Sequence, residues 1–342
     1  MIRKTLKYLG ALLAIYSLFC LITPFNKTLR KRSIQNQINY LSHILDEGYD
    51  DELQKRFPEG KLFSNCLLAL STIEYCNNYQ LGNDRYAEVV DNCIRRIQSK
   101  RALGVFDQNL NPKYGIFYQG WTNLVYSTYL NSPVYEFSKI QTLVQQESLH
   151  IESELEQLQA DSLRTLETYN GSFWPADNLI GIASLENHDL QSDWIDLILE
   201  TSEHESGLIH HVGSSKNRIR GASSAMITYC LNKSNYSDIE DYNHKFKDIF
   251  VDSYMGIQLV KEYEDGSDRF DVDSGPILMG YGASATIMNI KTQASLSSAH
   301  AKVTWAAMNF ISIPFNMFRR KYFLFKKEPM LDLFMLWAST EL

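Results

Sequence analysis

Apolar residues recur along this chain with helical spacing, and this pattern constrains the fold more than any other feature of the sequence. They occupy positions i, i+3, i+4 and i+7 in many successive windows. The pattern predicts amphipathic helices over residues 63–79, 84–98 and 132–159. Clusters of Gly, Asn, Asp and Pro separate the windows, and little period-two alternation is present to indicate strands. We therefore expect an all-α chain.

Six of the expected helices share a further property. Each follows a loop that contains glycine or an aromatic residue, and each carries small residues that are expected to face inward. Their starts lie near residues 64, 121, 177, 222, 276 and 330, so successive starts are 45 to 57 residues apart. That interval accommodates an outgoing helix, a returning helix and their loops. We therefore expect residues 33–342 to form one domain, an (α/α)6 toroid of six helical hairpins; an open solenoid and an irregular bundle are the alternatives.

The N-terminus predicts a membrane anchor. Residues 8–25 contain no charged side chain, and basic residues stand on both sides of this run. The run is at the short end for a bilayer span, long for the apolar part of a signal peptide, and is followed by no clear small-residue cleavage site. Residues 1–32 are therefore predicted to be an uncleaved, single-pass transmembrane anchor with a basic flank. Its orientation stays open, so the body would be cytoplasmic or periplasmic/extracellular.

A second uncharged stretch, residues 303–318, precedes another basic cluster. Burial in the last hairpin is the favoured interpretation, and an interfacial membrane segment is the alternative.

Composition and motifs limit the classes of ligand and partner that the protein can have. The net charge of −7 and the lack of a basic stripe in the body of the chain argue against nucleic acid. The five cysteines and the His210–His211 pair lack metal-site spacing, while a bridge between Cys66 and Cys76 stays open. P-loop, dinucleotide-binding and G-x-S-x-G motifs are missing from the sequence. We therefore expect a small-molecule ligand and no metal or cofactor; the oligomeric state stays open.

In a closed toroid the loops before the inner helices converge on one funnel, although they lie far apart in the sequence. Helix N-termini offer unpaired N–H groups and a positive dipole end to an anionic or hydroxyl-rich ligand. Asp177 is the leading catalytic candidate there, because it follows Trp174 and Pro175 and opens an apolar helix. An aromatic wall would desolvate its carboxyl group and raise its pKa, as a general acid requires. The alternative is that Asp177 is the N-cap of the helix.

Asp271 and Asp273 are the other catalytic candidates. In an extended segment they would point to the same side, and with Asp177 they could form the carboxyl pair of a glycoside hydrolase. Alternatively, Asp273 or Ser274 caps a helix that begins at Pro276.

The candidate binding residues are mostly aromatic. Aromatic rings at the inner-helix starts can stack on a sugar or a terpenoid skeleton, although core packing is the alternative for each. An arginine there could clamp a carboxylate or a phosphate, with an interhelical ion pair as its alternative. The candidates are Tyr118, Trp121, Trp174, Asn178, Arg220 and Tyr281.

Three segments resemble, in order and approximate spacing, parts of linalool dehydratase-isomerase: FYQGWTNLVYSTYL (117–130), FWPADN (173–178) and DVDSGPILMGYGASAT (271–286). The resemblance implies an (α/α)6 barrel with a pocket at the inner-helix ends, acting on a monoterpene alcohol. The Asp177–Asn178 pair and the tyrosine and glycine of residues 118–120 match in kind. The two active-site cysteines of that family fall near Pro175 and Ala183, and its histidine falls at Trp121, so its thiol and imidazole chemistry does not carry over.

Together these features predict a membrane-anchored enzyme that uses acidic residues on a carbohydrate, a polyol or an isoprenoid alcohol. One alternative is a hydro-lyase or isomerase acting on an alcohol, closer to the resembled family. The other is a non-catalytic anchored binding or assembly protein, which the missing cysteines motivate.

Overall fold

The computed structural model describes residues 2–213, 218–269, 274–323 and 329–342. They are mostly helical, which confirms the predicted all-α class. The α-helices are α1 (Ile2–Ile22), α2 (Lys27–Asp46), α3 (Tyr49–Arg56), α4 (Gly60–Tyr79), α5 (Asp84–Ile97), α6 (Lys100–Leu103), α7 (Gly115–Leu130), α8 (Gln141–Asp161), α9 (Pro175–Ala183), α10 (His188–Ser202), α11 (Gly221–Lys233), α12 (Ile239–Phe250), α13 (Ala283–Ser295), α14 (Ala299–Ile311) and α15 (Pro329–Glu341). Two 3₁₀ turns are η1 (Thr23–Phe25) and η2 (Tyr135–Phe137).

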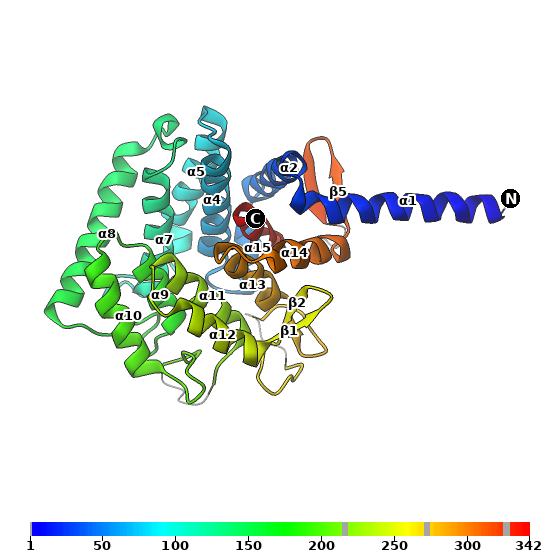
Figure 1. Ribbon diagram of the computed structural model, residues 1–342. Helices are drawn as coiled ribbons and strands as arrows, with labels where there is room; N and C mark the ends of the chain where they lie inside the picture. The colour runs from blue at the N-terminus through cyan, green and yellow to red at the C-terminus, as the bar shows by residue number, and fades with distance from the viewer. Residues whose placement is uncertain (1, 214–217, 270–273, 324–328) are drawn as a thin grey trace.

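Six of these helices pack in a closed cycle (Figure 1). Around the cycle, α4 contacts α7, α7 contacts α9, α9 contacts α11, α11 contacts α13, α13 contacts α15, and α15 returns to α4. We call these six the ring helices. A second helix packs against each of them: α5 on α4, α8 on α7, α10 on α9, α12 on α11, α14 on α13 and α2 on α15.

The sequence of each helix reflects its place. The ring helix α4 is buried on nearly all sides, including its polar residues Ser64, Asn65, Ser71 and Thr72. The outer helix α5 buries one stripe that contains Val90, Cys93, Ile94 and Ile97, and its other side is polar. A helix that packs against the body on one side buries a single apolar stripe, whereas a helix surrounded by other helices is buried on all sides.

Small residues let the ring helices approach closely. A Cβ atom on Gly120 of α7 would lie 2.8 Å from the backbone nitrogen of Gly181 on α9, which is closer than real Cβ atoms come. Glycine at position 120 is therefore required by the crossing of these two helices.

The fifth ring helix begins later than predicted. The sequence placed its start at Pro276, but a short antiparallel pair, β3 (Ile277–Leu278) and β4 (Tyr281–Gly282), comes first and α13 starts at Ala283. Met279 and Gly280 form the turn with φ values of 54° and 83°, a left-handed conformation that interrupts a helix. Two similar hairpins pair β1 (Val251–Tyr254) with β2 (Ile257–Val260) and β5 (Pro314–Met317) with β6 (Arg320–Phe323).

The helix predicted over 132–159 is likewise shorter at its start, because α8 begins at Gln141. The buried carboxylate of Asp91 accepts hydrogen bonds from Ser138 Oγ and from the backbone N–H of Lys139, both at 2.8 Å. These bonds stabilise a turn between α7 and α8 in place of a helical one. Cys66 and Cys76 are both buried on α4 and are free thiols, so no bridge joins them.

Among the residues that the structure describes, no helix is long and apolar enough to cross a membrane, so the fold lends the predicted transmembrane anchor no support. Helix α1 projects away from the body, as Figure 1 shows, and packs mainly against α14 and η1. Helix α2 runs through the predicted boundary at residue 32 and packs against α4 and α15.

Candidate functional site

A pocket of about 530 Å³ lies at the N-terminal ends of the ring helices. All six contribute to its lining from their first two turns or from the residue just before them. The contributors are Glu59 and Phe63 for α4, Phe117 and Trp121 for α7, Trp174 and Asp177 for α9, Ala222 and Ser223 for α11, Ser284 and Met288 for α13, and Met330 and Phe334 for α15. Residues from distant parts of the sequence thus meet at one site.

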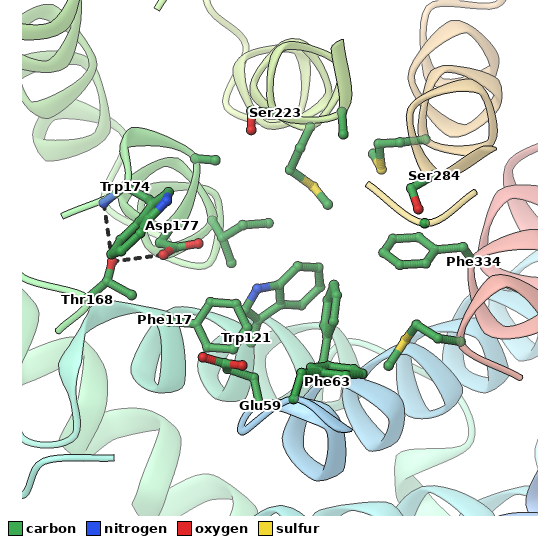
Figure 2. Close-up of a pocket in the computed structure, with 18 of the residues that line it drawn as sticks. Glu59, Phe63, Phe117, Trp121, Thr168, Trp174, Asp177, Ser223, Ser284 and Phe334 are labelled. Carbon is green, nitrogen blue, oxygen red and sulfur yellow. Dashed lines mark hydrogen bonds between the residues drawn. The ribbon is translucent and has the colours of Figure 1, made fainter. Parts of the chain in front are cut away.

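The pocket wall is mainly aromatic and aliphatic (Figure 2). The ring of Phe63 makes edge-on contacts with Phe117, Trp121 and Phe334, with centroid separations of 5.9, 4.8 and 5.3 Å. Interlocked rings of this kind have little freedom to move, so the wall has a fixed shape. Met226, Met288 and Met330 add flexible apolar surface that can adapt to an irregular ligand.

Asp177 brings a carboxylate to this wall. It is the third residue of α9, and Trp174 occupies the N-cap position, so Asp177 is not the N-cap. Thr168 Oγ1 donates a 2.8 Å hydrogen bond to Asp177 Oδ2 and accepts a longer one, 3.4 Å, from the backbone N–H of Trp174 (Figure 2). The Thr168 hydroxyl therefore orients the Asp177 carboxyl group.

The loop that carries Thr168 is itself held in place. Asn178, fully buried, donates through Nδ2 to the Leu166 carbonyl at 3.0 Å and accepts from the Leu166 N–H at 2.8 Å. The backbone of Gly115, with φ at +80°, passes so close that a Cβ atom there would lie 2.5 Å from the Thr168 carbonyl oxygen. Asn178 therefore positions the partner of Asp177, and it does not line the pocket.

A second carboxylate, Glu59, lines the same pocket from the residue before α4 (Figure 2). The sequence did not single it out, because the first ring helix was expected to start near residue 64 and begins at Gly60. The sequence signal that could have identified Glu59 is its position directly before Gly60, the small first residue of α4.

A polar chain reaches the pocket from the α11 side. Glu262 Oε1 accepts a hydrogen bond from Arg220 Nε at 2.9 Å and lies 2.7 Å from Arg220 Nη2 in an ion pair, and all but a few per cent of both side chains is buried. Arg220 Nη1 lies 3.2 Å from His211 Nε2, and His211 Nδ1 lies 2.6 Å from Ser223 Oγ. His211 and Ser223 line the pocket.

The arginine determines the direction of these hydrogen bonds. A guanidinium group only donates, so His211 Nε2 must be the acceptor and the imidazole is neutral with its proton on Nδ1. That proton is donated to Ser223 Oγ, which leaves the Ser223 hydroxyl hydrogen to point elsewhere. His211 therefore cannot act as the base that activates Ser223. The chain instead orients Ser223 as a donor at the pocket.

Of the binding residues proposed from the sequence, Trp121 and Trp174 line the pocket with Asp177. Tyr118 packs away from it against the rings of Phe106 and Tyr114, and burial raises its pKa. Arg220 does not line the pocket, since its partner is Glu262 as in the ion-pair alternative.

Tyr281 also lies outside the lining, where its hydroxyl donates to Asp252 Oδ2 at 2.9 Å. Asp271 and Asp273 lie outside the described residues. Gly275 and Pro276, which follow them in the chain, line the pocket.

In the described part of the chain, no group of three or more His, Cys, Asp and Glu side chains is arranged to hold a metal ion. No protein-family model matches this sequence, and no curated protein matches it.

Proposed function

We propose that the ring is an (α/α)6 toroid and that its pocket binds a mostly apolar alcohol of the isoprenoid type. The observation that carries the proposal is the lining: a continuous wall of aromatic rings and methionines with a few polar groups, among them Asp177, Glu59 and Ser223. A carbohydrate would need partners for many hydroxyl groups, whereas an isoprenoid alcohol needs partners for one. The sequence resemblance to linalool dehydratase-isomerase points to the same ligand class.

The reaction we propose is the loss or migration of a hydroxyl group by acid–base catalysis. Asp177 in its acid form protonates the departing hydroxyl, which leaves as water when the C–O bond breaks. Glu59 removes a proton from the neighbouring carbon, and that C–H electron pair becomes the new double bond. Aromatic faces stabilise the allylic cation that develops between the two steps.

We also retain the single-pass anchor as a proposal. Leu13, Ile15 and Leu21 of α1 are each exposed over about half of their surface or more, and they point to three different sides of the helix. A helix that is apolar all round is stable in a protein core or in lipid, and the described chain offers α1 no such core. An apolar alcohol would also be concentrated near a bilayer.

The test is product analysis by gas chromatography with mass detection. The full-length protein would be incubated with ten- and fifteen-carbon allylic alcohols and, separately, with a panel of glycosides. We expect an alkene or a rearranged alcohol from the first panel only, and loss of turnover in Asp177→Asn and Glu59→Gln. Asp189→Asn is the matched control, because Asp189 also lies in the first turn of a helix, α10, but is exposed and outside the pocket.

Glycoside hydrolysis would overturn the proposal in favour of the carbohydrate enzyme. Tight binding of an alcohol that is never converted would favour the binding protein.

A further inference from the structure

The β5–β6 hairpin displays apolar side chains at the protein surface. Phe318 at its tip is 86% exposed, and Phe315 and Met317 on β5 are exposed over about half of their surface. Phe315 and Met317 alternate along the strand and therefore share one face. Arg319 and Arg320 follow directly and are also exposed.

The conformation of the turn does not account for a phenylalanine at its tip. Phe318 and Arg319 occupy the two turn positions with φ values of 50° and 60°, a left-handed pair for which Asn and Gly are the favoured residues. A phenylalanine in this conformation is unusual and gains no burial in return.

The hairpin is fixed to the body and cannot fold its tip away. Tyr322 stacks on Phe315 at 5.9 Å and contacts Tyr40 of α2 at 5.6 Å. Asn39 Nδ2 donates to the Arg319 carbonyl at 2.8 Å, and the buried Lys321 donates to Asn309 of α14 at 2.9 Å. The face with Asn316 and Lys321 is packed on α2 and α14. The opposite face carries Phe315, Met317 and Tyr322, and from it Tyr322 contacts the ring of Tyr40.

The hairpin also lies where α1 leaves the body (Figure 1). Tyr16 of α1 donates a 3.1 Å hydrogen bond to the Phe310 carbonyl, and the two rings lie 5.6 Å apart. Phe310 is in the last turn of α14, and β5 begins at Pro314. The root of the hairpin therefore lies beside the projecting helix, and its tip lies farther along α2, next to Asn39.

Charge distribution identifies the partner of this face. Residues 1–45 and 274–327, which include α1, the first turns of α2, α14 and the hairpin, contain 14 of the 33 lysines and arginines. They contain none of the 40 aspartates and glutamates, in a chain with a net charge of −7. Two of these cations, Lys291 and Lys321, are buried, whereas Arg319 and Arg320 at the tip are exposed. Exposed apolar side chains beside exposed arginines suit the interface of an anionic bilayer.

We propose that the β5–β6 tip is a second membrane contact, which inserts Phe318 and Met317 at the headgroup level while Arg319 and Arg320 bind anionic lipid. Together with α1 it holds the body at a fixed orientation to the bilayer. This corrects the burial that the sequence suggested for residues 303–318, since their last part is an exposed hairpin.

The test uses full-length protein in phosphatidylcholine vesicles with and without phosphatidylglycerol. All five native cysteines are buried, so an environment-sensitive fluorophore can be attached to a single introduced cysteine: Met317→Cys on the tip, Leu13→Cys on α1, or Leu149→Cys on α8. Leu149 is a matched control, because it is an exposed apolar residue on the opposite side of the body from α1 (Figure 1).

We expect the label at 317 to be blue-shifted and to be quenched by nitroxide-bearing lipids, as at 13, and the label at 149 to show neither effect. Quenching at 317 should increase with phosphatidylglycerol. Arg319→Gln should reduce this quenching. The loss of one charge that contributes ~1 kcal/mol lowers the equilibrium constant for contact between the tip and the bilayer by about fivefold.

A label at 317 that behaves like the one at 149, while 13 is quenched, overturns the hairpin contact and leaves the anchor intact. A blue shift at 317 that follows protein density without lipid quenching overturns it in favour of a second copy of the chain. If neither 13 nor 317 is quenched, both membrane proposals fail.

Discussion

Lys291 Nζ lies 2.6 Å from Glu74 Oε2, and this ion pair spans the interior of the ring. Lys291 is on α13 and Glu74 on α4, and these ring helices are not neighbours in the cycle. Glu341 of α15 also pairs with Lys291, at 2.7 Å, and the ring of Trp337 lies 4.8 Å from its ammonium. Trp337 in turn contacts Trp121, which lines the pocket. The cluster therefore closes the end of the ring opposite the pocket.

The first prediction concerns this closure. Glu74→Gln should lower the free energy of unfolding by about 2–3 kcal/mol, less than a fully broken buried pair because Glu341 remains. Glu52→Gln is the control: its pair with Lys55 has the same 2.6 Å separation but is exposed, and it should cost at most about 0.5 kcal/mol. Guanidinium unfolding followed by tryptophan fluorescence measures both. Equal losses of unfolding free energy in the two variants would show that the buried cluster stabilises the protein no more than an exposed ion pair does.

The second prediction tests the helix crossing beneath the site. Gly120→Ala should destabilise the protein by about 1–3 kcal/mol, because its Cβ would press on the backbone of Gly181 and force α7 and α9 apart. Gly181→Ala should cost less, since its Cβ would meet the end of the Ile116 side chain, 2.7 Å away, which can rotate. Thermal unfolding of the two variants gives the comparison, and the reverse order would contradict it.

The order of the helices along the chain could be predicted from the sequence, because the periodic burial of apolar residues is set by residues that are close in sequence. Pro175 marks the first residue of α9, and the third residue, Asp177, lines the pocket as a helix start in a ring should. Where left-handed residues intervene, as at Met279 and Gly280, the apolar pattern continues through a hairpin and the predicted start is wrong.

The site could be predicted only in part, because side-chain direction depends on a rotation of 100° per residue. Phe117 and Trp121 are four residues apart and share the pocket face, whereas Tyr118 is turned toward Phe106 and Tyr114. The chain from Glu262 to Ser223 joins three segments of sequence through tertiary contacts. No local sequence pattern predicts this hydrogen-bonded chain.

The third prediction follows from a buried lysine on the hairpin. Burial lowers the pKa of Lys321 from 10.5 to about 7, despite the opposing effect of Asp332. Between these values the unfolded chain binds a proton that the folded protein does not, so the free energy of unfolding should rise with pH across this window. The slope should reach about 1.4 kcal/mol per pH unit at most. Lys321→Met should remove it.

Asp332 gives the opposite slope in a separate window. Burial raises its pKa from 3.8 to about 7, so the folded protein holds the extra proton and stability should fall as pH rises through that range. A Lys321→Met protein that keeps its slope above pH 7 would assign that slope to another group.

The fourth prediction concerns the direction of the hydrogen bond at Ser223. Ser223→Ala should weaken the binding of an allylic alcohol by about tenfold, the worth of one hydrogen bond, without changing the melting temperature. Ser284→Ala, at a pocket hydroxyl outside the arginine–histidine chain, should have a smaller effect. Isothermal titration of the corresponding ketone then distinguishes the two directions. A ketone only accepts, so the tenfold loss should persist if His211 makes Ser223 a donor, and it should vanish if Ser223 accepts from the ligand.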